Sequence, residues 1–192
     1  MSRYRPGLLA LMLLLVGCSK ARVPYPEADS WPYRYQYRLV APEVNRETIF
    51  EDEEIAIVFS IGDTRIGFVL RNKTDDPVQV LWEQSAYIDG GGRAIRIIHR
   101  DVGYEKKNDP LSPSIVSARL ELSTEVLPAE YAFYVEYEDV WVESRLFPGD
   151  QELQPMYKGT IFGLRLTLKI REEIRPYDFR FKIAEVKLRQ GY

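Results

Sequence analysis

Residues 162–170 read Phe-Gly-Leu-Arg-Leu-Thr-Leu-Lys-Ile, and every second residue of this stretch is large and apolar. Successive side chains of a β-strand point to opposite faces, so a period of two gives one apolar face and one polar face. The apolar set is Phe162, Leu164, Leu166, Leu168 and Ile170, and the outward set is Arg165, Thr167 and Lys169. The stretch therefore predicts a long strand with one face on a core.

The rest of the chain extends this pattern. Residues 179–188 alternate in the same way, and we expect them to pair with the first strand across residues 171–178 as a closing hairpin. Further short segments rich in Val, Ile, Tyr and Phe are separated by Gly, Pro, Asn and Asp clusters. These predicted strands are 55–60, 66–71, 78–82, 86–88, 94–98, 111–116, 120–122 and 131–137.

Two more hairpins are predicted from turn composition. The polar run 72–77 should join strands 66–71 and 78–82, and the glycine-rich turn 89–92 should join strands 86–88 and 94–98. Residues 138–157 break the period several times, which indicates either an irregular excursion or a mobile flap. Eight or nine strands with hairpin spacing and no blade-length repeat predict an all-β fold, an immunoglobulin-like antiparallel β-sandwich in a single domain.

Four short motifs resemble a pattern in uncharacterised bacterial lipoproteins with immunoglobulin-like domains. A strand end with asparagine leads through a tryptophan to an aspartate-glycine hairpin in that pattern. The matching residues here are 70–74 (LRNKT), 80–82 (VLW), 87–92 (YIDGGG) and 97–99 (IIH). This resemblance implies a fold and no activity.

The N-terminus has the features of an export signal. Arg3 and Arg5 precede an apolar run from Leu8 to Val16, which is far too short to cross a hydrocarbon core of about 30 Å as a helix. The following Leu-Val-Gly-Cys, residues 15–18, resembles the bacterial lipobox. The resemblance implies that the peptide is cleaved before Cys18 and that this cysteine is lipidated, which would anchor the protein stably through several acyl chains.

The alternative for Cys18 is a free thiol that happens to follow a cleaved signal peptide. Ser19 follows Cys18, and the aspartate that retains enteric lipoproteins in the inner membrane is missing there, so we expect the outer membrane as destination. The chain then divides into a signal peptide at 1–17, a lipidated N-terminus and tether at 18–30, and a β-sandwich domain at 31–192.

Charge and cysteine content exclude several classes of function. Removal of residues 1–17 would leave 175 residues with 24 Lys and Arg against 29 Asp and Glu, a formal charge of −5. Nucleic-acid binding needs a basic face that releases phosphate counterions, so nucleic acid is not expected as a partner. Because Cys18 is the single cysteine, its lipidation would exclude disulfides, zinc–thiolate sites and thiol catalysis.

An aromatic stripe is the most unusual feature after the signal peptide. Trp31, Tyr33, Tyr35 and Tyr37 alternate with polar or basic residues, so an extended strand would place all four rings on one face. Exposed rings could stack on a sugar or on the apolar patch of a partner, whereas buried rings would belong to the core of the sandwich.

The sequence offers two further candidates for chemistry. His99, the single histidine, could form a nucleophilic site with Ser112, Ser114 or Ser117, or it could be an ordinary residue at a strand end. The acidic run 51–54 could bind calcium, but consecutive carboxylates on a strand point to alternate faces, which favours a solvated strand edge.

These observations predict a lipid-anchored, non-enzymatic protein of the bacterial outer membrane, without a cofactor or metal, with a structural, assembly or binding role in the cell envelope. Its expected partners are the membrane, through the N-terminal lipid, and another envelope protein or a glycan. One alternative is a carbohydrate- or peptide-binding module that uses the stripe 31–37 or the loop carrying Trp141 and Tyr157. Another is a hydrolase with a site near His99.

Overall fold

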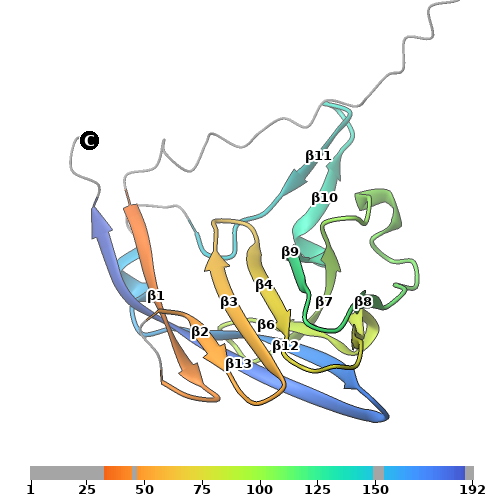
Figure 1. Cartoon of the computed structure of the whole chain (residues 1–192). Coiled ribbons are helices and arrows are strands. Elements are labelled where there is room, and N and C mark those ends of the chain that lie inside the picture. The colour runs from red at the N-terminus through yellow and green to blue at the C-terminus, as the bar shows by residue number, and fades with distance from the viewer. Residues whose placement is uncertain (1–32, 45–46, 149–153, 189–192) are drawn as a thin grey trace, which may run out of the picture.

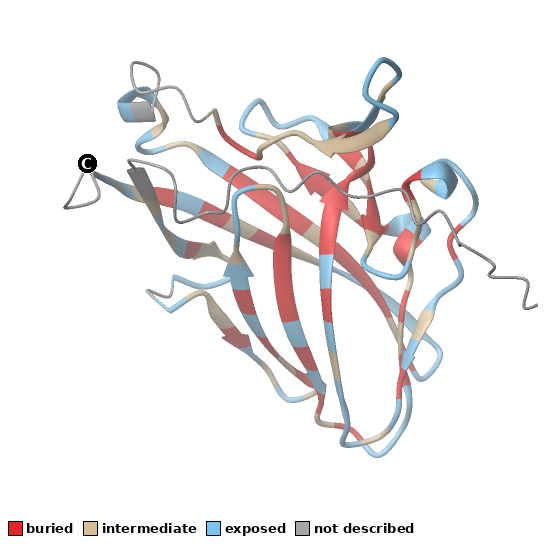
Figure 2. Cartoon of the chain, turned by 90° about the horizontal axis from the view of Figure 1, so that it is seen from above, coloured by how far each residue is buried: buried red, intermediate tan, exposed pale blue. Residues whose placement is uncertain are grey.

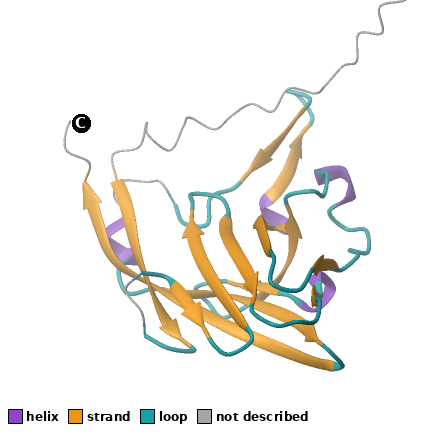
Figure 3. Cartoon of the chain, viewed as in Figure 1, coloured by secondary structure: helices purple, strands orange, loops and turns teal. Residues whose placement is uncertain are grey.

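The fold of the described chain is built from strands. The computed structural model describes residues 33–44, 47–148 and 154–188. The predicted signal peptide, Cys18 and Trp31 lie outside these ranges. Within them every regular element is a strand or a single turn of 3₁₀ helix (Figure 3), which confirms the predicted antiparallel all-β domain. The immunoglobulin likeness stays a prediction from the four motifs.

The strands are β1 (Tyr33–Ala41), β2 (Ile49–Glu51), β3 (Ile55–Ile61), β4 (Ile66–Asn72), β5 (Val78–Val80), β6 (Ala86–Ile88), β7 (Ala94–His99), β8 (Ser114–Val116), β9 (Glu121–Pro128), β10 (Ala132–Val135), β11 (Val140–Glu143), β12 (Ile161–Ile170) and β13 (Glu173–Leu188). The 3₁₀ turns are η2 (Trp82–Gln84), η3 (Tyr104–Lys106), η4 (Ala129–Tyr131) and η5 (Gln154–Tyr157). None of these described helices is long and apolar enough to span a membrane.

Strand β12 is the centre of the larger layer. It pairs with β13 along all ten of its residues and, on its other edge, with β6 and β5. The five apolar residues of its predicted inward face are all 2% exposed or less, as expected. Gly163 permits the close approach of β13, because a Cβ there would lie 2.4 Å from the Phe179 carbonyl oxygen. Of the predicted outward set, Thr167 is buried, whereas the Arg165 and Lys169 side chains are 43% and 33% exposed, so the outer face of β12 is covered only at its middle.

The closing hairpin has a tighter turn than predicted. β13 begins at Glu173, so Arg171 and Glu172 form the connection, and Arg171 adopts a positive φ of 54°. Pro176 lies within β13, at a part of the strand whose other edge β1 does not cover. Proline lacks a backbone N–H and is tolerated at such an open edge, so residues 173–178 belong to β13 and not to the predicted connection 171–178.

The two layers are joined through β7. Strands β1, β13, β12, β6, β5 and β8 form one layer, and β2, β3, β4 and β9 form the other (Figure 1). β7 pairs with β6 on one side and with β9 on the other, so hydrogen bonding continues around this corner. β3 and β4 alternate between buried and exposed residues (Figure 2), and their inward side chains meet those of β12 and β13.

The predicted hairpin between residues 66–71 and 78–82 is wrong. β4 pairs with β3 and β9, whereas β5 pairs with β12 and β8, so the chain crosses between layers at residues 72–77. The Asn72 side chain, which is fully buried, explains the crossing. Its amide nitrogen lies 3.1 Å from the Val116 carbonyl oxygen and 3.2 Å from that of Ser117, where β8 crosses to β9. Its Oδ1 accepts hydrogen bonds from the Thr74 backbone and hydroxyl.

The predicted strand 131–137 is shorter and lies elsewhere than expected. β10 pairs with β11 as a separate two-stranded hairpin, which projects from the layers in Figure 1. Phe133 and Tyr137 are therefore exposed, at 40% and 86%. The base of the hairpin rests on a second small cluster of Ile98, Tyr104 and Leu127, against which Trp141 packs.

We predict that Asn72→Ala lowers the free energy of unfolding by about 3 kcal/mol. The substitution removes the Asn72 hydrogen bonds to the Val116 carbonyl and the Thr74 amide, whereas the Ser117 and Asp76 carbonyls keep the Leu120 amide and the Thr74 hydroxyl as donors. Each buried polar group that loses its partner costs roughly 1–3 kcal/mol. Urea unfolding checks this, with Asn108→Ala as the control because Asn108 is exposed. A loss no larger than that of the control would show that Asn72 does not fix the crossovers.

Candidate ligand-binding site

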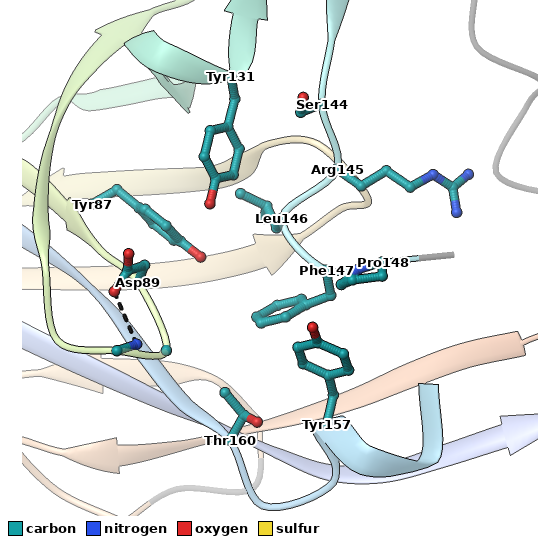
Figure 4. Close-up of a pocket in the computed structure, with 12 residues that line it drawn as sticks. Tyr87, Asp89, Tyr131, Ser144, Arg145, Leu146, Phe147, Pro148, Tyr157 and Thr160 are labelled. Carbon is teal, nitrogen blue, oxygen red and sulfur yellow. Dashed lines mark hydrogen bonds between the residues drawn. The ribbon is translucent and has the colours of Figure 1, made fainter. Parts of the chain in front are cut away.

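A pocket of about 640 Å³ opens where the β6–β7 turn, η4, the segment after β11 and the start of β12 meet (Figure 4). We call it the aromatic pocket. Its size lies within the roughly 300–1,000 Å³ of small-molecule sites. It is lined by Tyr87, Asp89, Gly90, Gly91, Tyr131, Ser144, Arg145, Leu146, Phe147, Pro148, Tyr157 and Thr160.

The β6–β7 turn forms one side of the pocket, and Asp89 organises it. The Asp89 carboxylate accepts hydrogen bonds from the backbone amides of Gly91 and Arg93, each at 2.9 Å. These backbone hydrogen bonds hold the pKa of Asp89 below its usual value although burial acts in the opposite direction. Gly90 abuts Thr160, since a Cβ there would lie 2.9 Å from the Thr160 methyl carbon. The turn is thus fixed against the start of β12.

Residues 144–148, which we call the wall segment, form the opposite side without belonging to a strand. The Ser144 amide donates to the Tyr131 carbonyl oxygen at 2.7 Å, and the Leu146 amide donates to that of Asp63 at 2.8 Å. These contacts tie the segment to η4 and to the β3–β4 loop. The wall segment is therefore held in place although it lacks the regular hydrogen bonds of a sheet.

Glu143, the residue before the wall segment, anchors it through a polar cluster. Its carboxylate accepts hydrogen bonds from the Arg65 guanidinium, the Thr64 hydroxyl at 2.7 Å and the Tyr104 hydroxyl. Burial by itself would raise the pKa of Glu143, but these three donors outweigh it and lower the pKa to about 2. Glu143 and Arg65 are each about one-fifth exposed, so water screens their attraction only partly.

The far end of the wall segment rests on β1. The Tyr35 hydroxyl donates to the Pro148 carbonyl oxygen at 2.9 Å, and burial raises the pKa of Tyr35 to about 12, which keeps this donor protonated. The Phe147 ring lies 4.8 Å from that of Phe162 and 6.3 Å from that of Tyr37. The rings of β1 and β12 therefore support the pocket wall from behind.

The aromatic stripe is thus only partly described, and its described side chains are half-buried. Trp31 lies outside the described residues, as does the side chain of Tyr33. Tyr35 and Tyr37 pack on the core rather than forming an open binding face. They contribute to the candidate site by contacting Phe147, which lines it.

Three tyrosine hydroxyls in the pocket have no partner among the described residues. They belong to Tyr87, Tyr131 and Tyr157. In Figure 4 the rings of Tyr87 and Tyr131 point into the space that Phe147 and Tyr157 face from the other side. The Tyr87 and Tyr131 rings are 6.0 Å apart, and the Phe147 and Tyr157 rings are also 6.0 Å apart. Two ring pairs, Tyr87 with Tyr131 and Phe147 with Tyr157, thus border one cavity, and among the described residues none of the three tyrosine hydroxyls has a partner.

His99 lies in a different place. Its ring stacks on Trp82 at 4.7 Å, and its Nδ1 lies 3.6 Å from an Asp101 carboxylate oxygen. Burial lowers the pKa of His99, so the neutral form is favoured in the folded protein. Ser114 accepts a hydrogen bond from the Trp82 indole, and among the described residues no hydrogen bond joins His99 to Ser112, Ser114 or Ser117.

The acidic run 51–54 does not converge on one point. Glu51 pairs with Lys73 and Glu54 with Arg175, while Asp52 accepts hydrogen bonds from the Glu54 and Ile55 amides. Nowhere in the described ranges do three His, Cys, Asp or Glu side chains gather as a metal site would need. Glu51 and Glu53 are exposed, as the predicted solvated edge requires, whereas Asp52 and Glu54 are partly buried and bonded within the protein.

Sequence reasoning singled out Tyr157 and the irregular loop around it, but it missed most of the pocket. The sequence pattern predicts Tyr87 and Tyr131 only as strand residues, and it gives no signal for Phe147. One signal in the sequence points to the pocket, namely the loss of period two between residues 138 and 157. An irregular segment rich in aromatic residues must be held by long-range side-chain and backbone contacts, and such segments often line binding sites.

We predict that Glu143→Gln destabilises the protein by ~3 kcal/mol at pH 7 and by progressively less as the pH falls from about 4.5 toward 2. The folded-state pKa lies below the unfolded-state value near 4.5, so the stabilisation is present above that value and disappears as the carboxylate protonates. Urea unfolding at a series of pH values measures this, with the exposed Glu136→Gln as control. A difference between wild type and Glu143→Gln that stays constant with pH would contradict the assigned role.

Comparison of the chain with protein-family models, with curated proteins and with solved structures finds no match in any of the three. The interpretation of the aromatic pocket therefore rests on its geometry and on the chemistry of its side chains.

Proposed function

We propose that this chain is a lipid-anchored, non-enzymatic protein of the bacterial outer membrane that binds a small ligand in the aromatic pocket. The lipobox resemblance of residues 15–18 supports the anchor. The observation that carries the binding role is the pocket itself, in which two ring pairs border one cavity and three hydroxyls lack a partner among the described residues. Thr124 Oγ1 is the one buried side-chain polar atom without a partner among the described residues, so the three tyrosine hydroxyls reach solvent and can donate to or accept from a ligand.

A role in envelope assembly is the second candidate, and the β10–β11 hairpin favours it. This hairpin projects from the layers and exposes Phe133 and Tyr137 (Figure 1). Exposed aromatic residues of this kind are common where proteins contact one another. The pocket is the stronger candidate, because its shape and polar groups are fixed by contacts from four parts of the chain.

The anchor gives the first test. Cys18→Ser removes the atom that would carry the lipid, so we expect the protein to leave the membrane fraction or to remain uncleaved, and to lose incorporation of labelled palmitate. Ser19→Ala, which keeps the lipobox cysteine, serves as the control. Unchanged membrane association of Cys18→Ser would show that lipidation does not anchor the protein.

The pocket gives the second test, by hydroxyl-radical footprinting of the full-length protein with mass spectrometry. A low-mass extract of the bacterial envelope should reduce labelling of Tyr131 and Tyr157 at least about twofold, because a ligand between the rings shields them. Tyr137, which is 86% exposed, reports any general loss of radicals. Equal labelling of all three tyrosines with and without extract would contradict the binding role.

A further inference from the structure

We propose that the ligand of the aromatic pocket is a neutral carbohydrate, an inference that rests on the binding role proposed above. The pocket presents ring faces and side-chain hydroxyls, and its two charged side chains have partners within the protein. Three properties of the site lead to this ligand class: its charge balance, its polar groups and the pairing of the strands beside it.

Charge balance favours a neutral ligand. The Asp89 carboxylate accepts hydrogen bonds from two backbone amides and from the Arg93 side chain. The Arg145 side chain extends away from the cavity in Figure 4, and its guanidinium lies 3.7 Å from the Asp63 carboxylate. A charged ligand would lose its hydration without meeting an uncompensated opposite charge, which is costly.

The polar groups of the pocket match those of a sugar. Tyr87, Tyr131 and Tyr157 each offer a hydroxyl that can both donate and accept, as do Ser144 and Thr160. Sugar hydroxyls have the same dual character, so one orientation of the ligand can satisfy several of them at once. The half-buried rings of Tyr131 and Tyr157 supply apolar surface on which the C–H groups of a pyranose can rest, and Phe147, only 6% exposed, supports the Tyr157 ring from behind.

Strand pairing beside the pocket argues against an extended peptide. A peptide that adds a strand needs an open sheet edge. β6 pairs with β12 on one edge and with β7 on the other, and β12 pairs with β13 along its whole length and with β6 from Gly163 onward. At the pocket end of β12 only Ile161 and Phe162 keep an open edge, which is too short to hold an added strand.

Isothermal titration calorimetry on the full-length lipidated protein tests the proposal, in a detergent without a sugar head group. The probes are maltose, cellobiose and N,N′-diacetylchitobiose, which are neutral, with digalacturonate, deacetylated chitobiose and tetraproline as anionic, cationic and peptide comparators. We expect at least one neutral disaccharide to bind more tightly than every comparator. Tyr157→Ala should weaken that binding by roughly tenfold or more, since it removes a stacking ring.

Two further variants separate the contribution of the Tyr157 ring from that of its hydroxyl and control for a general effect of replacing a tyrosine. Tyr157→Phe keeps the ring and should weaken binding less than Tyr157→Ala, whereas Tyr137→Ala, on the projecting hairpin, should leave it unchanged. Three outcomes would overturn the proposal. None of the three neutral disaccharides binds, a comparator binds more tightly than all of them, or Tyr157→Ala binds the disaccharide as tightly as the wild type. If the envelope extract still shields Tyr131 and Tyr157 in that case, the binding role stands and only the ligand class is wrong.

Discussion

The structure depends on the position of β12, which is paired on both edges and buries its apolar face in the core. Its ten-residue register with β13 fixes the larger layer, and its pairing with β5 and β6 sets where the chain enters and leaves that layer. A strand in this position must alternate strictly on the core face, and it needs glycine where a neighbouring backbone comes too close, as at Gly163. The apolar residues of β3, β4 and β13 then complete one continuous core.

The candidate site lies where this regularity stops. Residues 144–148 have no strand partner, so specific long-range contacts hold them: Glu143 at one end, the Leu146 amide in the middle and the Pro148 carbonyl at the other end. Each contact comes from a different part of the chain. These contacts hold the wall segment in one position, as a preformed binding site requires. Because the segment is not paired with a strand, its side that faces the pocket stays open to a ligand.

Much of the fold could be predicted from the sequence, because period two is a local property. It located β3, β4, β12, the β6–β7 hairpin and the inward face from Phe162 to Ile170 correctly. The hairpin predicted across residues 72–77 was wrong because the side chain of Asn72 bonds to carbonyls more than forty residues away, and turn composition carries no such information. The pocket was largely missed for the same reason, since Tyr87, Tyr131 and Tyr157 meet only through the tertiary structure.

The central claim is that the aromatic pocket is a preformed site whose tyrosines contact a neutral sugar. Fluorine NMR of the full-length protein labelled with 3-fluorotyrosine tests it most directly, once variants have assigned the signals. We expect the signals of Tyr131 and Tyr157 to shift progressively as the disaccharide that binds is added, while that of Tyr137 stays in place. Shifts confined to Tyr137 and Tyr134 on the projecting hairpin, or no shift at any tyrosine, would contradict the account.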